Sequence, residues 1–226
     1  MTEPAAERLP LFPLGLVLFP GMLLPLHLFE ERYLRLTEER SGADPIFGVV
    51  LTKQGREVGD QPEIHHIGTS ARLLGAGRYE DGRYDIVVRG GRRFRVDDGD
   101  WTASYFTASV NWLDDVPLAA PAASQVSALS TQVAHAYHQF LAAFEQATGA
   151  EVAADELPDD PIDLGYASCA RIPLNTWERQ ELLEEASPGD RLDKLLAILR
   201  RERALLEQTG AGGATIDRPG MGFLAN

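Results

Sequence analysis

The sequence predicts an α+β protein in which a β-rich N-terminal half precedes a helical C-terminal half. Up to about residue 115, short apolar runs separated by turn residues show the two-residue period of strands. After Pro117, apolar residues recur every three or four positions, which is the helical period. We therefore expect a twisted β-domain over residues 1–115, a helical bundle over 116–207 and a Gly-rich tail over 208–226.

The β half should contain several short strands and one helix. Strands are expected over residues 9–14, 24–26, 47–51, 71–74, 84–88, 93–96 and 105–110, and a helix over 30–39. Asp81-Gly82 predicts a hairpin turn, and Gly90-Gly91 is expected to interrupt the next strand. The alternation turns Phe94 inward and leaves Arg93 and Arg95 on a solvated face. Four phenylalanines are predicted to be core residues: Phe12, Phe19, Phe47 and Phe94.

The sequence of the C-terminal half contains signals for the first residues of its helices. A long apolar stripe runs from Val126 to Phe144. Three later helices each start with a side chain that can cap the first backbone amides, namely Asp160, Asn175 and Ser187. These signals predict four helices packed as a bundle.

Composition limits the classes of function. The net charge is −13, which disfavours a nucleic-acid partner because phosphates would be repelled. The single cysteine, Cys169, rules out an internal disulfide and suits a reducing, cytoplasmic location. Residues 9–29 are apolar but interrupted repeatedly, at Pro10, Pro13, Pro20, Gly21 and Pro25, so we expect no membrane helix. The N-terminus does not read as a secretory signal.

Residues that could carry chemistry are scarce. The sequence has neither a G-x-S-x-G elbow nor a phosphate loop. His135 and His138 lie three apart, but a zinc site needs three or four ligands. Cys169 is expected to be a buried apolar residue. We therefore predict no catalytic residue, no metal and no cofactor.

Several motifs in order resemble one known family. LPLFPL at 9–14, LFPG at 18–21 and LPLHLFEERY at 24–33 look like the opening of the Lon protease N-terminal (LON substrate-binding) domain. FGVV at 47–50, GGRRFRV at 90–96 and the segments at 160–166 and 172–184 are similar to later parts of it. The resemblance implies a PUA-like pseudobarrel followed by a helical bundle, and recognition of polypeptide. With no phosphate loop and no Ser-Lys pair, it implies a stand-alone form without ATPase or protease activity.

Three functions follow as hypotheses. The first is a non-catalytic module that binds unfolded or exposed apolar polypeptide segments, as an adaptor for a protease or chaperone. The second is a small-molecule-binding regulatory domain with a pocket between the two halves, and the third, disfavoured by charge, is RNA binding. An exposed apolar groove favours the first, an enclosed pocket the second and a contiguous arginine face the third. For the first, the expected contact residues are Arg32, Tyr33 and Trp177, where the two halves would meet.

Overall fold

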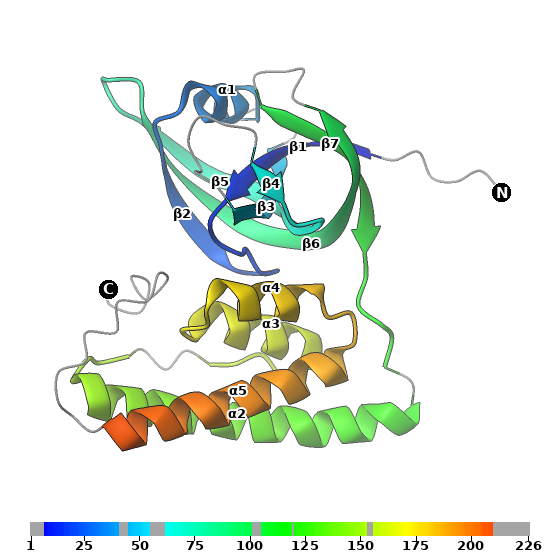
Figure 1. The fold of residues 1–226 in the computed structure, drawn as a ribbon, viewed down its shortest axis with the longest axis vertical. Helices are drawn as coiled ribbons and strands as arrows, with labels where there is room; N and C mark the ends of the chain where they lie inside the picture. Colours follow the sequence, from blue (N-terminus) through cyan, green and yellow to red (C-terminus); the bar gives the residue numbers. More distant parts are fainter. Residues whose placement is uncertain are drawn as a thin grey trace. The chain divides into compact units, whose positions relative to one another are not determined.

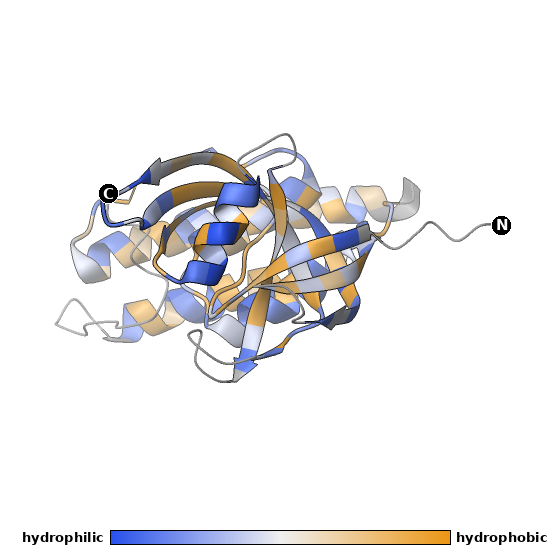
Figure 2. Ribbon diagram, turned by 90° about the horizontal axis from the view of Figure 1, so that it is seen from above, coloured by the Kyte–Doolittle hydropathy of each residue, from blue (hydrophilic) through white to orange (hydrophobic). Residues whose placement is uncertain are grey.

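A computed structural model describes residues 7–40, 45–54, 62–100, 105–118, 120–152 and 156–209. Its strands and helices confirm the α+β class. The chain forms two compact units, Met1–Asp114 and Asp115–Asn226, which are described separately. Coloured by hydropathy, the elements show hydrophobic residues interleaved with hydrophilic ones (Figure 2), as expected where one side of an element is buried.

Unit 1 is a seven-stranded sheet with one helix. The strands pair in the order β1-β7-β6-β5-β3, and β1 also pairs with β3, so the sheet closes on itself (Figure 1). β4 extends from β3, and β2 pairs with β6. The elements are β1 (Glu7–Leu14), β2 (Leu23–Leu28), α1 (Glu31–Arg40), β3 (Ile46–Gln54), β4 (Glu63–Ile64), β5 (Ile67–Arg78), β6 (Tyr84–Asp100) and β7 (Phe106–Leu113).

Strand β1 can accommodate two prolines because it changes its pairing partner halfway along its length. Residues 7–11 pair with β7, and residues 11–14 pair with β3. Pro10 and Pro13 therefore each lie where the strand has one neighbour, so the missing N–H can face the unpaired side.

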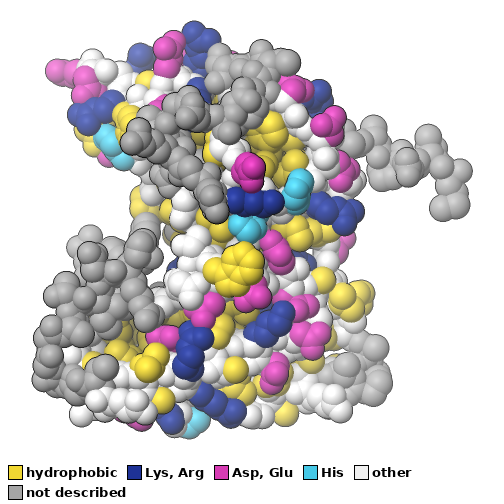
Figure 3. All heavy atoms as spheres, in the orientation of Figure 1, with side chains coloured by type: hydrophobic (Ala, Val, Ile, Leu, Met, Phe, Trp, Pro, Cys, Tyr) yellow, Lys and Arg dark blue, Asp and Glu magenta, His cyan; other side chains and the backbone are white. Residues whose placement is uncertain are grey.

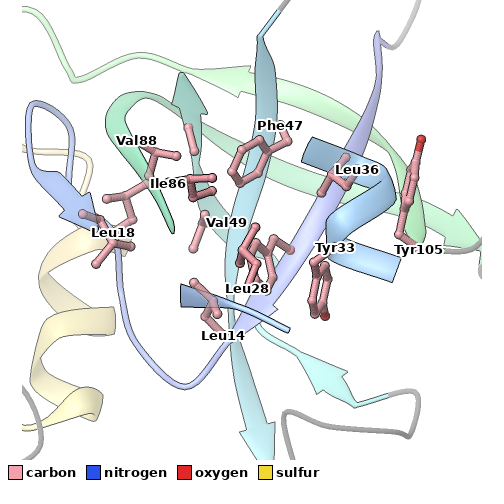
Figure 4. Packing of buried hydrophobic residues seen from close by; sticks show 13 residues of the cluster. Leu14, Leu18, Leu28, Tyr33, Leu36, Phe47, Val49, Ile86, Val88 and Tyr105 are labelled. Carbon is pink, nitrogen blue, oxygen red and sulfur yellow. The ribbon is translucent and has the colours of Figure 1, made fainter. Parts of the chain in front are cut away.

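Both faces of β1 and β3 are buried, which explains why their sequences are apolar runs rather than strict alternations. Phe12 and Val49 belong to one core cluster, and Leu11 and Val50 belong to another. Figure 4 shows side chains of α1 and of the strands meeting in the first cluster. The four phenylalanines predicted to be core residues are confirmed, with exposed fractions of 5% or less: Phe12, Phe19, Phe47 and Phe94.

Two expectations about the basic strand are wrong. Gly90-Gly91 does not interrupt it, because β6 continues for 17 residues through both glycines. They allow close approach instead, since a Cβ on Gly90 would lie 2.0 Å from the carbonyl oxygen of Phe19. Arg93 is not solvated but 2% exposed, and it donates to the carbonyl oxygen of Asp114. Arg95 is exposed, as expected.

Unit 2 contains four helices: α2 (Ala120–Thr148), α3 (Pro161–Arg171), α4 (Thr176–Glu184) and α5 (Pro188–Thr209). α5 contacts each of the other three. The three predicted caps are confirmed, because Asp160 accepts from two backbone amides of α3, Asn175 forms a capping box with Glu178, and Ser187 accepts from the Asp190 amide. The predicted Gly-rich tail begins near the end of α5. Its short apolar cluster, Met221, Phe223 and Leu224, which could dock on another surface, lies outside the described residues.

A buried arginine joins three parts of unit 2. Arg191, near the start of α5, is fully buried, and its Nε donates to the carbonyl oxygen of Leu182 over 3.2 Å. Its Nη2 donates to the carboxylate of Asp115 and to the carbonyl oxygen of Glu185. The guanidinium lies 4.1 Å from the ring centroid of Tyr166, whose hydroxyl also donates to Asp115. This network ties the first residue of the unit to α3, α4 and α5.

Candidate functional site

The candidate site is the outward face of three neighbouring strands in unit 1, β2, β6 and β5. We call this surface the outer face. Central strand β6 pairs with β2 on one side and with β5 on the other. The register aligns three rows across the strands. The rows are Leu23, Arg89 and Arg72; Pro25, Val87 and Gly75; and His27, Asp85 and Gly77.

A turn before β2 sets which of its residues point outward. The backbone amide of Met22 donates to the carbonyl oxygen of Phe19, with Pro20 and Gly21 at the turn's centre. Gly21 has a φ of +77°, which suits glycine at this position of a type II turn. The backbone amide of Gly21 donates to the carbonyl oxygen of Gly90, and the backbone amide of Gly90 donates to the carbonyl oxygen of Met22. This arrangement starts β2 in the register that buries Leu24 and Leu28, packs Leu26 against the core and exposes Pro25 and His27.

The middle of the outer face is hollow. A groove of about 550 Å³ is lined by residues of all three strands: Pro25, Leu26, His27, Gly75, Ala76, Gly77, Asp85, Ile86 and Val87. The hollow exists because β5 lacks side chains here. A Cβ on Gly75 would meet no atom within 4 Å, and one on Gly77 would meet only a carbonyl oxygen at 3.9 Å. Packing therefore does not require these two glycines, and their effect is to leave the groove open.

The three strands that line this groove also carry large apolar side chains that are not buried. Leu23 is 51% exposed, Leu74 is 50% exposed and Val87 is 40% exposed. Leu74 lies at the irregularity between Leu73 and Gly75, where β5 carries one residue more than β6. Clustered exposed apolar residues around a hollow mark interaction sites more often than isolated ones do.

One end of the groove is polar. Nδ1 of His27 lies 2.7 Å from the Asp85 carboxylate, and Nη1 of Arg83 lies 3.2 Å from Nε2 of His27. The hydroxyl of Tyr79 also donates to Asp85. These hydrogen bonds from Tyr79 and then His27 lower the pKa of Asp85, while the pKa of Tyr79 is raised by the same carboxylate. Figure 3 shows charged groups of both signs together with histidine at the upper left, where Figure 1 places the β5–β6 turn.

The three contact residues expected from the sequence have different environments. Tyr33 is 4% exposed and stacks on Phe12 at 3.8 Å between ring centroids, so its ring belongs to the core. Arg32 pairs with Glu30 over 2.7 Å, and its guanidinium lies 4.8 Å from the Tyr33 ring centroid. Trp177 lies in the first turn of α4 and is 65% exposed. Arg32 and Tyr33 share α1 in unit 1 and Trp177 is in unit 2, so their joint role stays a prediction.

Unit 2 has a smaller hollow of its own. It measures about 390 Å³ and lies between the start of α4 and the last turns of α5. Its charged groups pair with each other, because Arg201 lies 2.7 Å from both Glu178 and Glu202. These charged groups therefore already have partners within unit 2.

The described residues offer little for catalysis. Burial raises the pKa of the Cys169 thiol to about 12, so it stays protonated at neutral pH. Within the described ranges, no three His, Cys, Asp or Glu side chains are placed to hold a metal ion. His135 and His138 are both exposed on α2. None of the helices that the structure describes is long and apolar enough to cross a membrane.

The fold is shared with known N-terminal domains of Lon proteases. A Lon N-terminal domain protein from Xanthomonas campestris aligns with a TM-score of 0.58 and 28% identity, covering 84% of this chain and 98% of that one. The N-terminal domain of Lon protease from the Mycobacterium avium complex aligns with a TM-score of 0.63 over 86% of this chain and 98% of that one; at 18% identity it supports the fold alone.

Sequence comparison gives the family. The model of the ATP-dependent protease La (LON) substrate-binding domain matches residues 8–201, and the chain belongs to that family. Lon protease 2 from Desulfotalea psychrophila is 30% identical over 88% of this chain. Lon protease from Brevibacillus choshinensis is 27% identical over 92% of it. The chain spans about a quarter of these relatives, 26% and 27% of their lengths, and the match is to their substrate-binding part.

Proposed function

We propose that this protein binds unfolded or exposed apolar segments of polypeptide through the groove on its outer face. The single observation that carries the proposal is a hollow of about 550 Å³ that packing does not require, on strands that carry exposed apolar side chains. Membership of a substrate-binding family supports a recognition role. An open groove favours polypeptide over a small molecule, which is usually enclosed on most sides.

The proposal includes a non-catalytic role. The chain would present bound polypeptide to a separate protease or chaperone, as an adaptor. The match to the substrate-binding part of Lon supports this reading, as does a buried thiol held in its protonated form. We also propose that the closed sheet of unit 1 is a PUA-like pseudobarrel and that the four helices of unit 2 are a bundle.

Filling the groove should weaken binding strongly while leaving the protein folded. Gly75→Leu places a side chain where no atom lies within 4 Å of the Cβ and where φ is not in the left-handed region. We expect the affinity for a chemically unfolded model polypeptide to fall about tenfold or more, since a blocked central pocket removes a binding hot spot. Fluorescence anisotropy with the labelled polypeptide measures the change.

The matched control adds the same side chain elsewhere. Ala142 is exposed on α2, so Ala142→Leu adds equal apolar surface away from the groove. Thermal unfolding should show both variants folded, and Ala142→Leu should bind like the parent. Equal affinity of folded Gly75→Leu and parent would move the binding surface away from this groove.

A further inference from the structure

Two arginines on the outer face lie side by side without a described acidic partner. Arg72 of β5 and Arg89 of β6 are direct cross-strand neighbours, and both are exposed. Among the residues that the structure describes, neither forms an ion pair or hydrogen bond through its side chain. Like charges directly opposite each other destabilise a sheet. The pair is therefore expected to lower the stability of unit 1, and no interaction with a described residue offsets this loss.

The contrast with other arginines of unit 1 strengthens this point. Four of them lie within 3.9 Å of an aspartate, namely Arg8, Arg83, Arg92 and Arg95. With a net charge of −13, acidic partners are abundant in this chain. An unpaired cationic pair in such a protein is a local exception, and it offers a binding position for an anionic group.

The arginine pair is continuous with the groove. Arg89 lies two residues from Val87 along β6, and Arg72 precedes Gly75 on β5. Two residues of a strand span about 7 Å and place both side chains on one face. A ligand that contacts the arginines and the groove together must therefore carry a negative charge about 7 Å from an apolar group. An extended polypeptide with an acidic residue and an apolar residue two positions apart has this spacing.

We propose that the outer face selects extended polypeptide segments in which an acidic side chain lies two residues from a large apolar one. The carboxylate pairs with Arg72 and Arg89, and the apolar side chain enters the groove over Gly75. This inference rests on the proposed function and adds the class of segment that is recognised. Charge complementarity identifies the ligand, because the arginine pair is cationic and the adjoining groove is lined largely by apolar residues and glycines.

Three short labelled peptides that differ at one position test the proposal on the full chain. They carry Glu-x-Leu, Gln-x-Leu or Lys-x-Leu in an otherwise identical Gly/Ser sequence, and anisotropy gives their affinities. We expect Glu-x-Leu to bind about fivefold more tightly than Gln-x-Leu at low salt, and Lys-x-Leu to bind most weakly. The preference should shrink as salt is added.

Variants assign the preference to the two arginines. In the double variant Arg72→Gln/Arg89→Gln the three peptides should bind equally. In Arg72→Glu/Arg89→Glu the order should reverse in favour of Lys-x-Leu. Arg95→Gln is the control, because Arg95 is an exposed arginine of the same strand that lies near Asp97. It should keep the parent order.

The outcomes separate this inference from the proposed function. One outcome is that Gln-x-Leu binds the parent and loses affinity in Gly75→Leu, while the three peptides bind the parent equally. This result would support the groove as the binding site and overturn the preference for an acidic residue. If none of the peptides binds, the proposed function itself fails. Tight binding of a single-stranded RNA that depends on both arginines, without any charge preference among the peptides, would also overturn the proposal.

Discussion

Replacing Phe94 with alanine is expected to lower the free energy of unfolding by about 3–5 kcal/mol, because a fully buried aromatic ring is removed and the surrounding core relaxes only partially into the gap. The ring lies in a slot made by two glycines. A Cβ on Gly48 would lie 2.6 Å from its Cζ, and one on Gly68 would lie 2.9 Å from it. The ring also meets Trp112 edge-on at 6.2 Å between centroids.

Urea denaturation of parent and variant measures this difference. Phe94→Leu keeps most of the volume and should cost less than Phe94→Ala. Arg95→Ala, the next residue along but exposed, should change stability by no more than about 0.5 kcal/mol. A Phe94→Ala protein that unfolds at the same urea concentration as the parent would show that this ring is not part of the core.

A loss of similar size is expected in unit 2 when Arg191 is replaced by methionine. The substitution keeps an unbranched side chain but removes the charge that pairs with Asp115. Removing one partner of a buried ion pair typically costs about 3–5 kcal/mol. Asp115 is partly buried, and after the substitution it would keep the Tyr166 hydroxyl as a partner but lose the opposite charge. The carbonyl oxygens of Leu182 and Glu185 would lose a donor as well.

The matched control lies on the same helix. Arg200 is exposed, so Arg200→Met should leave the melting temperature nearly unchanged. The double variant Arg191→Met/Asp115→Asn removes both charges and should recover part of the lost stability. If Arg191→Met is as stable as Arg200→Met, the network around Arg191 does not hold the helices together.

Local signals in the sequence predicted most of the elements. Capping side chains gave the starts of three helices correctly, because a cap is a contact within a few residues. The break at Gly90-Gly91 was predicted wrongly, since the requirement for glycine there comes from Phe19, a residue distant in sequence. The burial of Arg93 was missed for a similar reason, because alternation gives the face of a strand but not what covers it.

The groove could not be predicted from the sequence, although its parts were visible. Gly75 and Gly77 form a short glycine pattern, and Leu23 and Val87 are apolar residues on the outward side of their strands. These four positions become one surface only when β6 lies between β2 and β5. The same holds for Arg72 and Arg89, which are 17 residues apart in sequence and direct neighbours in the sheet.

The position of the bound polypeptide tests the account most directly. Backbone amide shifts of the full chain, recorded by NMR during titration with an unfolded polypeptide, report which residues change environment. The account predicts that the largest changes fall on residues 23–27, 72–77 and 85–89, which form the outer face. Changes concentrated instead on α4 around Trp177, with the outer face unaffected, would contradict it.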